Sequence, residues 1–152
     1  MPNSHGRVAT TIFCDDIRLE LGNKLSLMGV YQGQLVVPSA PLLLPKLCIY
    51  LTISGPAETP FRSLKIRFLK DQELIYEQPI DASALPEVQT PVREMESDPS
   101  NHLQTFVTTL VMSPFVIDKP FILRVRVDAD GDEMKAPGLM IVVGSQSPTS
   151  QP

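Results

Sequence analysis

Apolar and polar residues alternate along several short stretches of this chain, which is the pattern of half-buried β-strands. In residues 63–70, Leu64, Ile66 and Phe68 fall on one face, and basic residues fall mostly on the other. Residues 121–128 repeat this period of two. Both stretches are therefore predicted to be strands with one face in a hydrophobic core.

Turn-forming pairs separate the predicted strands at intervals of about ten residues, a spacing typical of all-β domains. Gly22-Asn23, Asp71-Gln72 and Asp130-Gly131 predict hairpin turns, the first because Gly and Asn tolerate a positive φ. We expect about eight strands and no helix, which favours an all-β fold built as an antiparallel two-sheet β-sandwich. A small closed β-barrel is the alternative.

The predicted core consists of the inward positions of these strands. We expect it to contain Ile12, Cys14, Leu25, Leu27, Leu64, Ile66, Phe68, Phe106, Leu123, Val125, Val127, Ile141 and Val143. Residues 139–143 (LMIVV) are predicted to form a buried last strand.

One domain is expected over residues 1–143, because 152 residues suffice for a single core. Residues 79–101 have no sustained apolar period and read as a long loop, of which residues 86–101 are expected to be mobile or to form an irregular flap. The polar residues 144–152 are predicted to be a disordered tail.

Composition narrows the possible partners. Hydrophobic residues make up 43% of the chain and charged residues 20%, which is a globular balance. Asp and Glu outnumber Lys and Arg by 17 to 13, giving a net charge of −4, which argues against nucleic-acid binding. The sequence shows neither a transmembrane-length apolar run nor a signal peptide. We therefore expect a cytoplasmic protein without nucleic-acid or membrane partners.

Few residues suggest catalysis. His5 and His102 have no obvious nucleophile beside them. Asp15 and Asp16 are adjacent, so in a strand they point to opposite faces, and an ion pair of Asp16 with Arg18 is the simpler reading. We expect no catalytic residue, no metal site and no cofactor.

An acidic segment, Asp128–Glu133 (DADGDE), has enough oxygen ligands to hold a cation. It lacks the glycine and glutamate spacing of an EF-hand loop, and a hairpin turn explains it more simply. A weak divalent-cation site remains the alternative reading.

The two cysteines, Cys14 and Cys48, each lie in an apolar predicted strand. A sandwich can place two such residues across its core, but no secretory signal favours a disulfide. We expect reduced core cysteines, since two thiols without further ligands are too few for a metal site.

A proline-rich segment, residues 36–45 (VVPSAPLLLP), is predicted to supply the binding surface for a partner or for a second copy of the chain. Its prolines lack backbone donors, so we expect Pro38–Pro45 to be a connection that crosses between sheets or lies at an edge. Side chains alternate in an extended chain, so at least one of Leu42, Leu43 and Leu44 is expected to be exposed. The alternative is that the segment plugs an open end of the sandwich.

Residues 13–18 (FCDDIR) and 22–31 (GNKLSLMGVY) resemble the opening of a family of small bacterial proteins of unknown function. In that family a CDDIR segment precedes a GK-SL-G-Y pattern, although here Asn23 separates Gly22 from Lys24. Downstream, residues 41–46 are similar to the family's proline-rich step into its next strand. The resemblance covers the first third of the chain well and implies no activity.

Taken together, these features favour a non-enzymatic protein-binding module that holds a protein partner or associates with itself. A phage-related structural or host-directed factor is one alternative, resting on analogy of fold alone. A small metal-dependent hydrolase that uses Asp15 and Asp16 or the acidic turn is the other.

Overall fold

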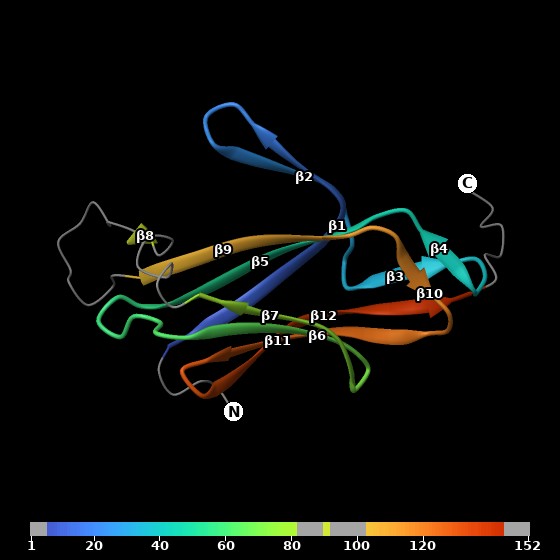
Figure 1. Ribbon diagram of the computed structural model, residues 1–152. Coiled ribbons are helices and arrows are strands. Elements are labelled where there is room, and N and C mark those ends of the chain that lie inside the picture. Colours follow the sequence, from blue (N-terminus) through green and yellow to red (C-terminus); the bar gives the residue numbers. More distant parts are fainter. Residues whose placement is uncertain (1–5, 82–89, 92–102, 145–152) are drawn as a thin grey trace.

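Two β-sheets packed face to face form the body of the protein (Figure 1). The computed structural model describes residues 6–81, 90–91 and 103–144, and these contain no helix. The sheets do not close into a barrel, which confirms the predicted all-β sandwich. The strands are β1 (Val8–Glu20), β2 (Lys24–Val30), β3 (Gln34–Val37), β4 (Leu42–Leu44), β5 (Leu47–Pro56), β6 (Leu64–Lys70), β7 (Glu73–Ile80), β8 (Thr90–Pro91), β9 (Leu103–Met112), β10 (Phe115–Ile117), β11 (Phe121–Ala129) and β12 (Asp132–Val143).

One pair of strands, at the edge of the second sheet, does not follow the antiparallel arrangement of the others. The first sheet has the order β2-β1-β5-β9-β8, the second β3-β12-β11-β6-β7, and β10 and β4 form a small separate pair. Every pair is antiparallel except β3 with β12, which run parallel. A parallel pair needs a long connection, and here most of the chain lies between the two strands. The predicted two-sheet sandwich therefore contains one parallel pair at an edge and more strands than the eight expected.

The core lies between the sheets and follows the predicted alternation. Leu64, Ile66 and Phe68 of β6 are each 2% exposed. On β11 and β5 every second side chain is likewise buried. Because strands alternate faces, one regular apolar period per strand suffices to fill this layer.

The three predicted hairpin turns are present. Gly22 and Asn23 join β1 to β2, Asp71 follows β6, and Asp130 and Gly131 join β11 to β12, all with positive φ. Residues that tolerate this conformation therefore mark the turns correctly.

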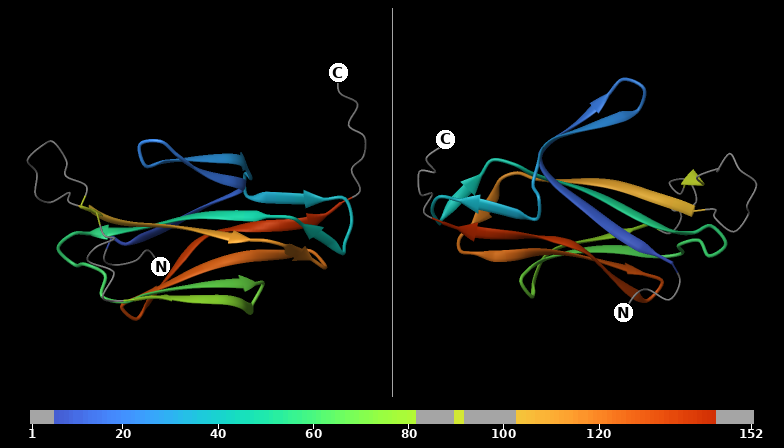
Figure 2. Two further views of the ribbon diagram at one scale, coloured as in Figure 1. Left: turned by 45° about the horizontal axis from the view of Figure 1, so that its top comes forward. Right: turned by 180° about the vertical axis from the view of Figure 1, so that it is seen from behind.

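Four residues predicted to lie in the core are not fully buried, and two of them lie on β2 in the projecting hairpin. Leu25 is 40% exposed and Leu27 is half-buried, because the hairpin projects from the sandwich on the side away from the second sheet (Figures 1 and 2). Ile12 and Val143 are also only half-buried. The last strand is not buried throughout, since Met140 is 49% exposed.

Other expectations fall on parts of the chain that are not described. Apart from the short β8, residues 86–101 lie outside the described residues, as do residues 145–152 of the predicted tail. No described helix is long and apolar enough to cross a membrane.

Candidate functional site

The base of the β1–β2 hairpin gathers the polar residues of the CDDIR segment. The Asp16 carboxylate accepts a hydrogen bond from Lys46 Nζ at 2.6 Å and lies 3.5 Å from Arg18 Nε. The hydrogen bond from Lys46 lowers the pKa of Asp16. The predicted Asp16–Arg18 pair is therefore present, joined by a lysine from the strand connection before β5.

Asp15 has a different set of partners. The Tyr31 hydroxyl donates a hydrogen bond to its carboxylate. Burial, followed by this hydrogen bond, raises the pKa of Tyr31. Gly29 has a φ of +68°, and a Cβ there would lie 2.2 Å from Asp15 Oδ2, so only glycine fits against the carboxylate. Asp15 and Asp16 thus serve separate contacts and do not converge on one point.

The two cysteines stand directly opposite each other on neighbouring strands. Cys14 of β1 pairs in register with Cys48 of β5, and both are free and buried. They lie on the outer face of the first sheet, because their neighbours Phe13 and Ile49 fill the core. The two cysteines are buried as expected, but their placement in the core between the sheets is corrected, because they face away from it. Their position across adjacent strands was not foreseen.

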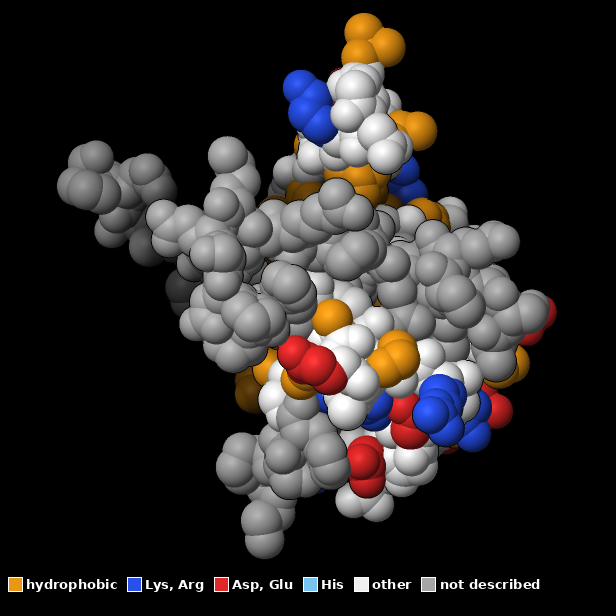
Figure 3. All heavy atoms as spheres, turned by 90° about the vertical axis from the view of Figure 1, so that its left-hand side faces the viewer, with side chains coloured by type: hydrophobic (Ala, Val, Ile, Leu, Met, Phe, Trp, Pro, Cys, Tyr) orange, Lys and Arg blue, Asp and Glu red, His pale blue; other side chains and the backbone are white. Residues whose placement is uncertain are grey.

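A groove of about 650 Å³ separates the hairpin from the first sheet. Leu19, Leu25 and Leu27 line its hairpin side, and Tyr50 and Val107 line its sheet side. Figure 3 shows hydrophobic and basic side chains together at the top of the molecule, where the hairpin projects. At the tip of this arm, Leu21 is 92% exposed.

The predicted partner-binding leucines form β4, paired with β10. Leu42 and Leu44 are half-buried against the core, whereas Leu43 is 60% exposed. Residues 38–45 connect β3 of the second sheet to β5 of the first, as expected, and within this connection β4 pairs with β10 in a two-stranded sheet. The prolines flank the three leucines and leave their backbone donors free to pair. The segment therefore covers the core with one face and exposes the other.

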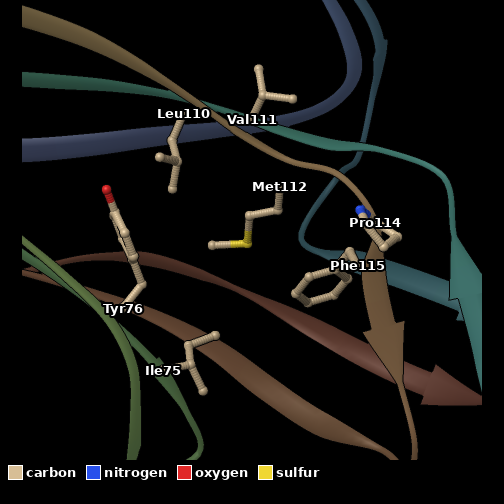
Figure 4. A pocket seen from close by; sticks show the side chains of 7 residues that line it. All are labelled: Ile75, Tyr76, Leu110, Val111, Met112, Pro114 and Phe115. Carbon is tan, nitrogen blue, oxygen red and sulfur yellow. The ribbon is translucent and has the colours of Figure 1, made fainter.

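A second apolar recess opens between the edges of the two sheets (Figure 4). It has a volume of about 300 Å³. Ile75 and Tyr76 of β7 face Leu110 and Met112 of β9 across it, with Phe115 at one end. Sequence analysis missed this recess, because only the strand order shows that β7 and β9 lie at edges on the same side.

The acidic turn is neutralised by arginines. Asp130 accepts hydrogen bonds from the backbone N–H groups of Arg62 and Ser63 and lies 2.9 Å from Arg7 NH2. Arg67 binds both Asp128 and Glu133. Among the described residues, no three groups of metal-ligating type lie close enough to hold an ion. These carboxylates stabilise the turn and the strands beside it.

The two histidines considered as catalytic groups, His5 and His102, lie outside the described residues. Within the described part of the chain, the features suited to binding are the edge of β9 with its recess, the hairpin groove and the exposed face of β4.

Comparison with known proteins agrees with the resemblance of the opening motif. No curated protein matches the chain. A family model described as a family of unknown function (DUF6941) matches residues 9–142, which span the sandwich and the hairpin. The chain therefore belongs to this family of unknown function.

Proposed function

We propose that the protein is a non-enzymatic protein-binding module, and that a second copy of the chain adds a strand to the open edge of β9. The observation that carries this proposal is the free side of β9. Its pairing with β8 involves only Gln104 and Thr105, and no other described strand covers the edge from Phe106 to Met112. Unpaired backbone groups along such an edge are ready to pair with another strand.

The composition of the β9 edge supports pairing, whereas that of β7 opposes it. Natural proteins protect edge strands with charges and prolines. The β7 edge carries Glu73, Glu77 and Pro79. The β9 sequence LQTFVTTLVM contains no charged residue and no proline. Of these two neighbouring edges, β9 is thus the one without protection.

The sequence of the β9 edge is also self-complementary. If two copies pair antiparallel about Thr109, Val107 lies opposite Val111 on the outer face, and Phe106 lies opposite Met112 on the inner face. A two-fold axis at this residue uses the whole of the β9 edge that no described strand pairs with. Apolar cross-strand pairs of this kind stabilise sheets by about 0.2–1 kcal/mol each.

The recess beside β9 gives the inner side chains of the added strand a place to pack. Leu110 and Met112 line it and already pack against the core. A strand added to β9 directs alternate side chains over this recess, so the second copy would cover apolar surface that is open in the single chain.

Charged substitutions at the paired positions test this arrangement. The double variant Val107→Lys/Val111→Lys places like charges opposite each other twice, and the variant Val107→Lys/Val111→Glu places opposite charges there. Sedimentation velocity over a range of concentrations should show a dimer for the wild type and the Lys/Glu variant and a monomer for the Lys/Lys variant. Met140→Lys, at an exposed position of the second sheet, is the matched control and should dimerise. A wild type that stays monomeric at every concentration contradicts the proposal.

The predicted leucine surface supports a second, weaker contact. Leu43 pairs with Val116 of β10, and both side chains are more than half exposed, at 60% and 53%. We keep Leu42, Leu43 and Leu44 as a proposed partner surface, with Leu43 as the residue that reaches the partner.

The same proposal includes that the protein has no catalytic activity and that it acts in the cytoplasm. It also includes that neither nucleic acids nor membranes are its binding partners. What supports it over a hydrolase is the use of the acidic groups: Asp15 and Asp16 bind Tyr31 and Lys46, and the acidic turn binds arginines. No observation favours a phage component over another binding role.

A further inference from the structure

The cysteine pair occupies directly opposite positions on two antiparallel strands, where a cross-strand disulfide can form. Directly opposite residues of an antiparallel pair have Cα atoms about 4.5 or 5.5 Å apart, and both values lie within the range of natural disulfides. Cys14 and Cys48 occupy such a pair, and the register continues regularly on one side from Phe13 and Ile49. Closure therefore requires rotation of two side chains and no rearrangement of the strands.

The two thiols also hold the base of the hairpin. Cys14 Sγ donates to the backbone oxygen of Asp16 at 3.4 Å, and Cys48 Sγ donates to that of Asp15 at 3.7 Å. These oxygens belong to the segment of β1 that leaves the sandwich and enters the hairpin (Figure 1). Loss of the two S–H groups removes both contacts at once.

We propose that Cys14 and Cys48 are a reversible redox pair that closes a cross-strand disulfide when a low-molecular-weight disulfide oxidises them. One thiolate attacks the oxidant, forms a mixed disulfide and releases the first small thiol. The second cysteine attacks the mixed disulfide and releases the second small thiol. Two electrons pass from the cysteines to the oxidant, and the two cysteine protons end on the released thiols.

Closure of this disulfide changes the hairpin and leaves the core in place. The cysteines lie on the outer face of the first sheet, so the packed layer between the sheets does not need to open. The carbonyl groups of Asp15 and Asp16 lose their sulfur partners, which loosens the base of the hairpin and the groove against Tyr50 and Val107. The state of the cysteine pair thereby controls how firmly the arm is held.

Access is the slow step. Cys14 is 0% and Cys48 1% exposed. Burial raises the pKa of both thiols, so the reactive thiolate is scarce at neutral pH. Because β2 is the edge strand of its sheet and pairs only with β1 among the described strands, local opening of the hairpin is the route by which the oxidant enters.

Oxidation of the full chain by glutathione disulfide tests the proposal. After acid quenching and alkylation, the intact mass should lack two hydrogen atoms and carry no alkyl group, and peptide mapping should find Cys14 joined to Cys48. Reduced glutathione should reverse the change. Amide exchange in residues 16–30 should be faster in the oxidised protein than in the reduced one, with residues 121–129 unchanged.

Cys14→Ala and Cys48→Ala are matched controls, and each should give only a mixed disulfide with glutathione. Three results would overturn the proposal: no reaction although both thiols alkylate in urea, products joined between chains, or an oxidation rate that follows global unfolding as urea is added. The oxidation assay on the wild type decides the question even if a variant fails to fold. The oxidation assay is independent of the proposed pairing of β9, which is tested by sedimentation of the reduced protein.

Discussion

Replacing Gly29 by alanine is expected to destabilise the hairpin strongly. The residue has a φ of +68°, and the added Cβ would lie 2.2 Å from Asp15 Oδ2 and 3.0 Å from Asp15 Cβ. Rotating the aspartate side chain relieves the first clash but not the second, because its Cβ does not move with χ1. Rotation also breaks the hydrogen bond from the Tyr31 hydroxyl.

The expected loss has two parts. A left-handed conformation costs alanine about 1–2 kcal/mol. Losing a hydrogen bond to a charged group costs about 1.5–3 kcal/mol when it is buried, and Asp15 is exposed, so we take about 1–2 kcal/mol. Together they predict a destabilisation of about 2–4 kcal/mol for Gly29→Ala.

Gly33 provides a matched control. Its φ is +81°, yet an added Cβ there meets no atom within 4 Å. Gly33→Ala should therefore lose only about 1–2 kcal/mol, the backbone part alone. In the background of Asp15→Ala, the cost of Gly29→Ala should fall but stay above that of Gly33→Ala, since the carboxylate is gone while the Cβ of residue 15 still lies 3.0 Å from the added Cβ.

Urea unfolding followed by circular dichroism measures these free energies, and amide exchange over residues 16–30 shows whether the hairpin opens separately. If Gly29→Ala and Gly33→Ala agree within about 0.5 kcal/mol in both measurements, the clash with Asp15 is not what requires glycine.

Three further predictions concern the core, the acidic turn and the leucine surface. Leu123→Ala, at a fully buried position, should lower the free energy of unfolding in urea by about 2–5 kcal/mol. Leu21→Ala, at the exposed hairpin tip, should change it by less than about 0.5 kcal/mol, and equal losses would contradict the assigned core. Burial opposes ionisation of Asp130, but hydrogen bonds from Ser63 and Arg62 and the charge of Arg7 outweigh it and lower its pKa. This carboxylate therefore adds stability above about pH 3.9 that is lost as the pH falls through its lower folded pKa, so Asp130→Asn should show a smaller drop in urea midpoint between about pH 6 and pH 3 than the wild type. Leu43→Asp should fold with unchanged stability and weaken association in light scattering; unfolding, or unchanged association, would contradict the role of Leu43.

Much of the fold was predictable because the core strands show a regular apolar period of two in the sequence itself. β6 and β11 alternate regularly, and positive-φ residues mark the turns that follow. The hairpin shows where this signal ends. Leu25 and Leu27 share a face as the period predicts, but the period does not say whether another layer covers that face. Here the strands leave the sandwich, so the face stays half open.

The binding features depend on strand order, which local sequence does not determine. Nothing in the β9 sequence distinguishes an edge strand from a central one, since a charge-free apolar strand fits either position. Cys14 and Cys48 are brought together by the pairing of β1 with β5, and that register cannot be deduced from their separation in the chain. The same holds for the recess, which needs the positions of both β7 and β9.

The residues of the opening motif have a structural explanation at the hairpin base. Asp15 contacts Gly29 and Tyr31 at the end of β2, and Asp16 contacts Lys46 directly before β5, so these contacts tie β1 to both of its neighbouring strands. Such a network fixes the direction in which an exposed arm leaves the sandwich, which packing alone does not do because β2 lacks a second neighbour among the described strands. A motif that orients an arm fits a protein that acts through its surface. Cys14 and Cys48 donate to the backbone oxygens of Asp16 and Asp15, the same two residues that make these contacts. Oxidation of the pair would therefore act at the base of the arm.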